Sequence, residues 1–316
     1  MSFVNKAYIE GYVYEHELEK RVTGKDSSVP NTEYIRGSVT VATDEKMLNT
    51  VNVNFVFVTK TFKSGSANST FTFLNDLIEG KHKTVMGSSK EEAVKVKIDT
   101  AIEVNDFYPK EGNKISDRLV SDVRFGGGFV HPITAFKEAE NKRATFKTDV
   151  VLSAVAMKDD EDDEDATGEE AILKGFAFNF RDELIPIKFD IVGKGAIDYF
   201  EGLLADGDLV YTNVWGSYVV QHSENKKITK SAFGDEDYVD CSDKVQKKFI
   251  VTGADADLPE WPNEDVELVD FMKGKMAERN TMLATKKAEA EERLKKANDK
   301  PANNVSANVK DSEFDF

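Results

Sequence analysis

Two alternating runs of β-branched and aromatic residues lie close together in the first third of the chain, Tyr34-Ile-Arg-Gly-Ser-Val-Thr-Val41 and Thr50-Val-Asn-Val-Asn-Phe-Val-Phe-Val58. Alternation over this length is typical of strands with one buried face. The next patterned run is Thr70-Phe-Thr-Phe-Leu-Asn-Asp-Leu-Ile78, whose apolar residues recur at intervals of three and four, as on one face of a helix. Two strands and a short helix are therefore expected in this order.

The same order returns in the second half of the chain as a weak internal repeat. Leu173-Lys-Gly-Phe-Ala177 matches Ile35-Arg-Gly-Ser-Val39, because each places an apolar residue, a base and a glycine at the entry to a strand. A second strand, Ile185–Phe189, and a short helix, Ala196–Leu204, follow it. Three strands, a short helix and two strands is the order of an OB barrel. The sequence therefore predicts a mainly β fold with two tandem OB-like five-stranded β-barrels.

Glycine and proline mark the division between the repeats. Three glycines and an X-Pro step lie within residues 126–132, so we expect the last strand of the first barrel to end at the glycines. Near the C-terminus, apolar residues fall on one face of a helix, but this stripe fades beyond Lys286, where the helix is expected to project into solvent. The expected organisation is a first barrel over 1–130, a second over 131–262, a C-terminal α-helix over 263–298 and a disordered acidic tail over 299–316.

The formal net charge of −16 argues at first against a nucleic-acid partner, but the acidity is local. Residues 1–130 carry 17 Lys and Arg against 18 Asp and Glu, whereas residues 131–260 carry 15 against 28. Seven consecutive acids over 159–165 supply much of that excess, in a stretch over 158–170 that we interpret as a solvated loop. The sharper hypothesis is that this loop covers the binding groove of the second barrel as a phosphate mimic.

The remaining composition restricts the compartment and the chemistry. A single cysteine, Cys241, can form no internal disulfide and no cysteine-based zinc site. The N-terminal residues lack a basic and then apolar leader, and no run of about 18 apolar residues occurs. We therefore expect a soluble cytoplasmic protein, in the host cytoplasm if the chain is phage-encoded.

A β-barrel body, a polar linker and an acidic tip with a terminal aromatic residue together resemble bacterial and phage single-stranded DNA-binding proteins. The resemblance implies that the tip docks replication, recombination and repair proteins. The tip residues are Asp311, Glu313, Phe314, Asp315 and Phe316. The usual bacterial member is shorter, has one barrel and forms a tetramer, so tandem barrels look more like a phage or other mobile-element version, and the oligomeric state stays open.

Binding a single strand without sequence preference requires positive charge along a groove and aromatic faces on which bases stack. Alternation in the strand over 34–41 leaves Tyr34 and Arg36 on the face opposite the core, as a stacking and phosphate-binding pair. The same register in the second half exposes Lys174, Phe176 and Phe178, with Phe180 beyond them. Further basic and aromatic candidates are Tyr12, Tyr14, Lys60, Phe62, Lys63, Arg181, Lys188 and Trp215. The first barrel is expected to be the stronger binder because its net charge is nearer zero.

Enzymatic interpretations find less support in the sequence. No GxxxxGK[ST] phosphate loop occurs, and the four histidines are scattered without metal-ligand spacing. We therefore expect no enzymatic activity, no catalytic residues, no metal and no cofactor. Two alternatives stay open: a non-enzymatic scaffold of tandem β modules that binds proteins, and a metal-dependent nuclease built from some of the 58 acids. Site size, cooperativity, DNA against RNA preference and the number of binding barrels also stay open.

Overall fold

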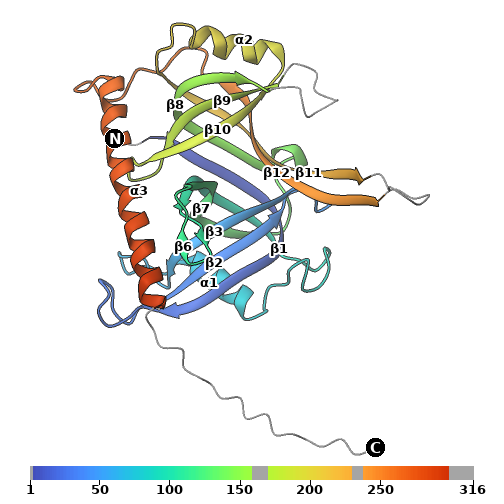
Figure 1. The fold of residues 1–316 in the computed structure, drawn as a ribbon. Helices are drawn as coiled ribbons and strands as arrows, with labels where there is room; N and C mark the ends of the chain where they lie inside the picture. The colour runs from blue at the N-terminus through green and yellow to red at the C-terminus, as the bar shows by residue number, and fades with distance from the viewer. Residues whose placement is uncertain (1–2, 159–169, 230–237, 299–316) are drawn as a thin grey trace, which may run out of the picture.

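The structure is a computed structural model that describes residues 3–158, 170–229 and 238–298. Figure 1 shows two β-barrels with a long helix running beside both of them. The acidic run over 159–165 and the tip over 311–316 lie outside the described residues. No helix among the described residues is long and apolar enough to cross a membrane.

Five strands close the first barrel, and a short helix lies between the third and fourth of them. Around the barrel the order is β1, β2, β3, β7, β4 and back to β1, with β3 and β7 parallel and every other neighbouring pair antiparallel. A small hairpin of β5 and β6 separates β4 from β7. The elements are β1 (Asn5–Val22), β2 (Glu33–Ala42), β3 (Thr50–Thr59), α1 (Ser69–Ile78), β4 (Lys95–Phe107), β5 (Lys110–Glu111), β6 (Lys114–Ile115) and β7 (Val120–Ile133).

The second barrel repeats this arrangement, with β8, β9, β10, β12 and β11 in order and β10 parallel to β12. Strand β1 also pairs with β8, so the strands of both barrels form one continuous sheet. The predicted mainly β fold of tandem OB-like barrels is confirmed. The elements are η1 (Glu140–Lys142), β8 (Ala144–Met157), β9 (Glu170–Phe178), β10 (Leu184–Val192), α2 (Lys194–Leu203), β11 (Val210–Thr229) and β12 (Tyr238–Ala254).

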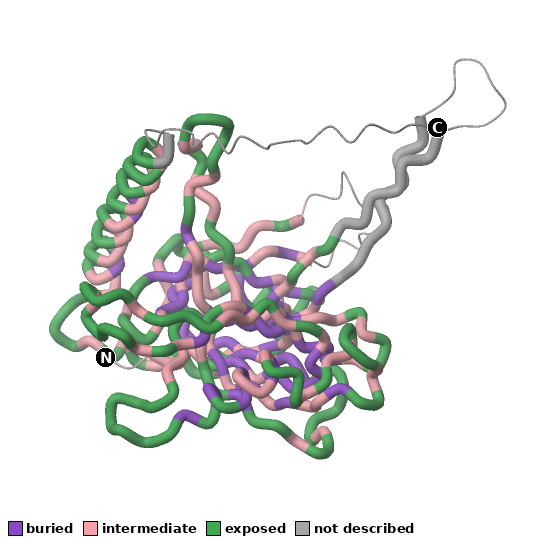
Figure 2. Tube along the Cα trace, turned by 90° about the horizontal axis from the view of Figure 1, so that it is seen from below, coloured by how far each residue is buried: buried purple, intermediate pink, exposed green. Residues whose placement is uncertain are grey.

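Alternating aliphatic residues fill the interior of each barrel, where Figure 2 shows the buried segments gathered. On β2 and β3 of the first barrel the buried side chains include Val39, Val41, Val51 and Val53, as the alternation predicts. Helix α1 contributes Leu74 to the same core. The burial of these apolar surfaces is the main favourable term that keeps each barrel closed.

The glycines that were expected to end the last strand of the first barrel lie inside β7 instead. Residue Thr100 of β4 faces a bulge in β7, because the pairing passes from Asp99 opposite Phe129 to Ala101 opposite Gly126. Gly128 has φ of +95°, and a Cβ atom there would lie 2.0 Å from the carbonyl oxygen of Asp99. The strand continues through the glycines because they absorb the bulge, so that prediction is wrong. The division of the chain into separate domains near residue 130 stays a prediction.

Helix α3 (Leu268–Asn298) packs on both barrels (Figure 1). On the second barrel, Met272 is buried against Phe178, and the Phe3 ring stacks on Phe178 at 3.9 Å between centroids. Phe178 is therefore fully buried, although the alternation of β9 predicted an exposed ring. The alternation holds within the strand, but α3 and the N-terminal segment cover this face.

The same helix reaches the first barrel through two cations. The Arg279 guanidinium donates from Nη2 to Asp106 Oδ1 of β4 at 2.7 Å and from Nη1 to the Leu184 carbonyl of β10 at 3.1 Å. Further along, Lys287 forms an ion pair with Asp117 and lies over the Tyr108 ring. The helix begins later than predicted, at Leu268, and Lys287 contacts the segment between β4 and β7. Beyond Lys287 most side chains of the helix are exposed.

Replacing Arg279 with Met should destabilise the fold, because the Asp106 side chain is only 1% exposed and, among the described residues, would keep only its hydrogen bond from Ser121. Removing one partner of a buried ion pair costs about 3–5 kcal/mol. Urea unfolding should show a loss of this size for Arg279→Met. Replacing Lys273, whose side chain is 72% exposed on the same helix, should change the free energy of unfolding by less than about 0.5 kcal/mol. Equal losses for the two variants would contradict this account of how α3 is held.

Candidate nucleic-acid interface

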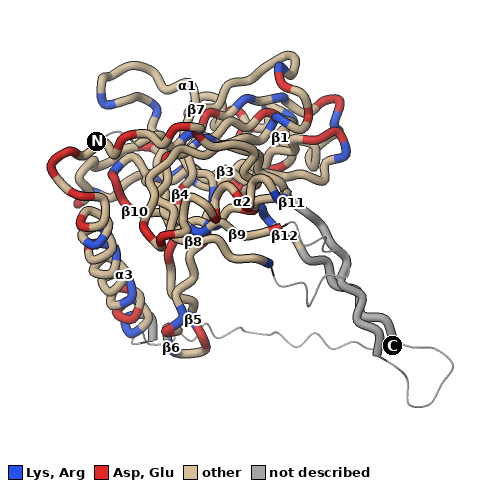
Figure 3. Tube along the Cα trace, turned by 90° about the horizontal axis from the view of Figure 1, so that it is seen from above, with Lys and Arg blue, Asp and Glu red and all other residues tan. Residues whose placement is uncertain are grey.

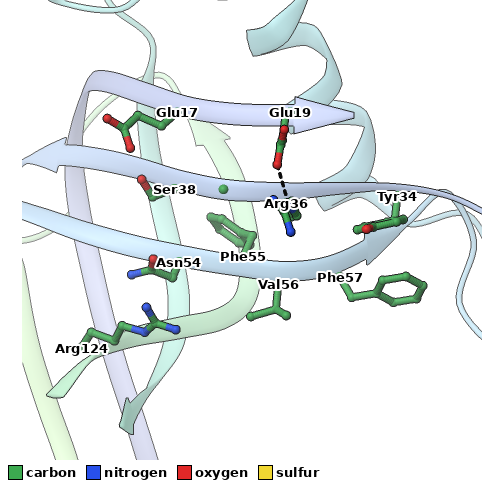
Figure 4. Close-up of a pocket in the computed structure, with 11 residues that line it drawn as sticks. Glu17, Glu19, Tyr34, Arg36, Ser38, Asn54, Phe55, Val56, Phe57 and Arg124 are labelled. Atoms are coloured by element: carbon green, nitrogen blue, oxygen red, sulfur yellow. Dashed lines mark hydrogen bonds and ion pairs between the residues drawn. The ribbon is translucent and has the colours of Figure 1, made fainter. Parts of the chain in front are cut away.

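Two adjoining hollows of about 600 and 620 Å³ lie along β3 on the exposed face of the first barrel. Both are lined by Phe55, Val56 and Phe57, so they form one continuous depression, which we call the β3 groove. The first hollow also reaches β1, β2 and β7 (Figure 4), and the second reaches the turn between β9 and β10. The groove therefore crosses the second and third strands of the barrel, the face with which OB folds bind oligonucleotides and oligosaccharides.

A β-bulge creates the apolar floor of this groove. The pairing of β2 with β3 passes from Ile35 opposite Val58 to Gly37 opposite Phe55, so Arg36 faces both Val56 and Phe57. Inside the barrel Phe55 is 2% exposed, whereas Val56 is 64% and Phe57 is 45% exposed. A bulge bends its strand and redirects side chains. Here it places two large apolar residues side by side on the surface.

Several aromatic rings border the groove. Tyr34 and Phe57 lie with ring centroids 4.6 Å apart and planes tilted by 38°. In the second hollow, Phe62 and Phe129 lie 6.2 Å apart, and Phe180 lines the same hollow from the second barrel. Rings that keep a free face in an open groove can stack with nucleic-acid bases, because every base has a π face.

Three arginines lie among these rings. Arg36 forms an ion pair with Glu19, which also pairs with Arg21. Arg181 lies over the Phe180 ring at 5.0 Å from its centroid. Arg124 of β7 forms no ion pair within the part of the chain that the structure describes, and its buried Nε atom has no hydrogen-bond partner there (Figure 4). A guanidinium that forms no ion pair can bind an anionic oxygen through its terminal nitrogens.

A carboxylate lies in the second hollow beside the arginines. Burial raises the pKa of Glu103, and the charges of Arg124 and Arg181 oppose that shift only in part. Gly126 makes the position possible, because a Cβ atom there would lie 2.1 Å from Glu103 Oε2. Glu183 also lines this hollow, and Glu17 and Glu19 line the first, so the groove combines aromatic faces and cations with several carboxylates.

The structure brings together four of the residues that the sequence proposed for nucleic-acid binding: Tyr34, Arg36, Phe62 and Arg181 line the β3 groove. Their role stays a prediction. Lys60 and Lys63 are exposed on either side of Phe62, just beyond the end of β3.

The other candidates lie elsewhere. Tyr12 is buried, with its ring edge against Phe136. Lys174 and Lys188 are exposed directly opposite each other on β9 and β10. Trp215 packs on Gly253 under Lys147. The remaining candidates that are partly or fully covered are Tyr14, which is half-buried on β1, Phe176, which is half-buried near α3, and Phe178, which is fully buried.

Sequence reasoning missed Phe57, Arg124 and Phe129. Phe57 has the same parity as the buried Phe55, so alternation alone assigns it to the core, and only the bulge reverses this. Phe129 is exposed directly after the bulge in β7. Arg124 lies in a strand that the sequence did predict. The one available signal was its place next to the buried Phe125, because alternation then puts Arg124 on the outer face of the strand.

Comparison with known proteins places the chain in a family. The family model described as YorF matches residues 4–289. The chain belongs to the YorF family. No curated protein matches the sequence of this YorF-family chain.

Among solved structures, the chain is similar to a deletion mutant of the single-stranded DNA binding protein from Thermus aquaticus. That likeness has 11% sequence identity and a TM-score of 0.46, and it covers 84% of this chain and 99% of the Thermus chain. At this identity and TM-score, the two chains share too little to transfer a site or a function.

Replacing Glu103 with Gln should stabilise the protein at neutral pH. The folded state raises the pKa of Glu103 through burial. The stability that this group contributes is therefore present below its unfolded pKa of about 4.3 and is lost as the pH rises through the folded value. The melting temperature of Glu103→Gln should exceed that of the wild type at pH 7, and the difference should vanish near pH 4.

The matched control is Glu264→Gln, because Glu264 is exposed in the segment before α3. It should leave the melting temperature unchanged at both pH values. A melting temperature of Glu103→Gln equal to or below that of the wild type at pH 7 would show that the arginines, rather than burial, dominate the environment of Glu103.

Proposed function

We propose that this YorF-family chain binds and protects single-stranded DNA without sequence specificity, through the β3 groove. The observation that carries the proposal is the interleaving of exposed aromatic rings with arginines along one face of the first barrel. Stacking on rings is tolerant of sequence, and arginine binds the phosphate that every nucleotide carries. The bound strand would be held with its bases apart from a complementary strand.

The distribution of charge favours binding of DNA within the β3 groove over its attraction to the whole surface. The net charge is −16, and Figure 3 shows basic and acidic residues interspersed over the barrels and α3. Long-range attraction of DNA to such a surface is weak. Stacking contributes on the order of 1–3 kcal/mol per base, so a few rings can supply most of the affinity.

The cellular role is a further part of the proposal. Protected single strands arise in replication, recombination and repair, and we propose that the tip over 311–316 recruits proteins of those processes in the cytoplasm. This part is supported by the resemblance of the tip alone, because those residues lie outside the described structure.

One observation favours the alternative of a protein-binding scaffold. An apolar hollow of about 580 Å³ lies between α2 and β12 on the second barrel, lined by Val192, Tyr199 and Phe200 among others. Strand β12 pairs with β10 at only two positions, which leaves part of its edge open beside this hollow. Open edges accept extended peptides.

Fluorescence anisotropy of a labelled oligo(dT) should show salt-sensitive binding by the full chain, with duplex DNA a poor competitor. Replacing Phe57 with Ala should weaken binding by about 1–3 kcal/mol through the loss of a stacked base. Replacing Arg124 with Ala should reduce the slope of log K against log salt by roughly 0.7, the value for one phosphate of a single strand. RNA in the competition would report the preference between the two nucleic acids.

Two control variants keep this test specific. Phe107 is 41% exposed and lies outside the β3 groove, so Phe107→Ala should leave the affinity unchanged. Lys273→Ala removes an exposed charge of α3 and should leave the salt slope unchanged. No binding by the wild type at low salt would refute the proposal and favour the scaffold.

A further inference from the structure

We propose that the hairpin turn between β9 and β10 of the second barrel completes the β3 groove of the first, and that its Phe180 stacks on a base of the bound strand. This inference rests on the proposed function and adds the residue that makes both barrels parts of one site. The ligand is a nucleotide within a single strand, with its base on Phe180 and its phosphate near Arg181.

The first support is the position of the turn. By chain order and strand pairing it belongs to the second barrel, since Leu184 of β10 pairs with Phe178 of β9. Phe180 and Arg181 nevertheless line the same hollow as Phe57 and Phe129 of the first barrel. Arg181 is also close enough to Glu103 of β4 to act on its ionisation. The turn therefore forms one wall of a groove whose floor is on the other barrel.

The second support is that the turn is held in one shape. Asn179 Oδ1 accepts hydrogen bonds from the backbone N–H of Arg181 at 2.8 Å and of Glu183 at 3.0 Å, and its Nδ2 donates to Glu183 Oε2 at 2.6 Å. The Asn179 N–H also donates to the Glu183 carbonyl at 3.1 Å. A side chain presented by such a turn is pre-organised, so binding loses less conformational entropy.

The third support is the exposure of Phe180. Phe180 is 81% exposed, whereas Phe178 and Leu184 on either side of the turn are buried. A single exposed ring needs no explanation. Here the ring lines one hollow together with the exposed side chains of Val56, Phe57 and Phe129, and grouped apolar exposure of this kind marks a binding surface.

The chemistry of the turn favours a nucleotide over an apolar peptide. Arg181 lies over the Phe180 ring, so the turn presents an aromatic face and a delocalised cation side by side. A base can stack on the ring while a phosphate oxygen accepts hydrogen bonds from the guanidinium. The two Arg279 contacts hold the start of β10 near the first barrel, which keeps the wall in place when the groove is empty.

The test uses the full chain and oligo(dT) in the anisotropy assay. Phe180→Ala should weaken binding about 5- to 150-fold without changing the salt slope, because it removes a stacked base and no charge. Arg181→Ala should instead lower the salt slope. The melting temperature of Phe180→Ala should match that of the wild type, since this side chain is exposed. Phe107→Ala is the matched control for loss of an exposed ring and should bind as the wild type does.

A direct measurement of contact with the base replaces Phe180 with Trp and follows its fluorescence. The fluorescence of Phe180→Trp should be quenched when oligo(dT) is added, beyond any change from Trp215 and Trp261 in the wild type, whereas Phe107→Trp should show no added quenching. If the wild type binds and Phe57→Ala weakens binding, but Phe180→Ala binds normally and Phe180→Trp is not quenched, the hairpin proposal is overturned and the groove stands. If the wild type does not bind at all, both proposals fail, and binding of an aromatic peptide becomes the next interpretation of this surface.

Discussion

The hydrogen bonding of β1 is the constraint on which the rest of the structure depends. A strand has two edges, yet β1 pairs with three strands: β4 and β8 along its first half, and β2 along its second half. Gly11 lies where the partners change, and a Cβ atom there would lie 2.1 Å from the Ala42 carbonyl oxygen. Because β1 closes the first barrel and also adjoins the second, the relative position of the barrels follows from backbone pairing. The shared groove depends on that position.

Within this arrangement of strands, two β-bulges place apolar side chains in the β3 groove. The bulge opposite Arg36 places Phe57 outside the barrel beside Val56, and the bulge after Gly126 does the same for Phe129. In regular strands Phe57 and Phe129 would share the parity of the buried Phe55 and Phe125 and would lie in the core. The face that OB folds use for ligands is thus built here by interrupting the alternation that makes the barrel.

Much of the fold could be predicted from the sequence because alternation and helical spacing are local signals. Val39, Val41, Val51 and Val53 are buried as their parity predicts, and α1 and α2 follow the third strand of each barrel. Less of the candidate site could be predicted from the sequence, because the site depends on contacts between distant segments. Phe178 is covered by α3, and Phe180 reaches a groove on the other barrel. No pattern within β9 reports either event, and bulges leave no periodic signature beyond their glycines.

The continuous sheet also governs how the molecule comes apart. Separating the barrels would strip β1 of its bonds to β8 and expose two hydrogen-bonding edges, and it would also leave Asp106 buried without Arg279. Such losses are large compared with the stability of a single small barrel. We therefore expect the folding of the two repeats to be coupled, although the sequence indicates a duplication. A substitution that weakens one barrel should then also lower the protection of backbone amides from hydrogen exchange in the other.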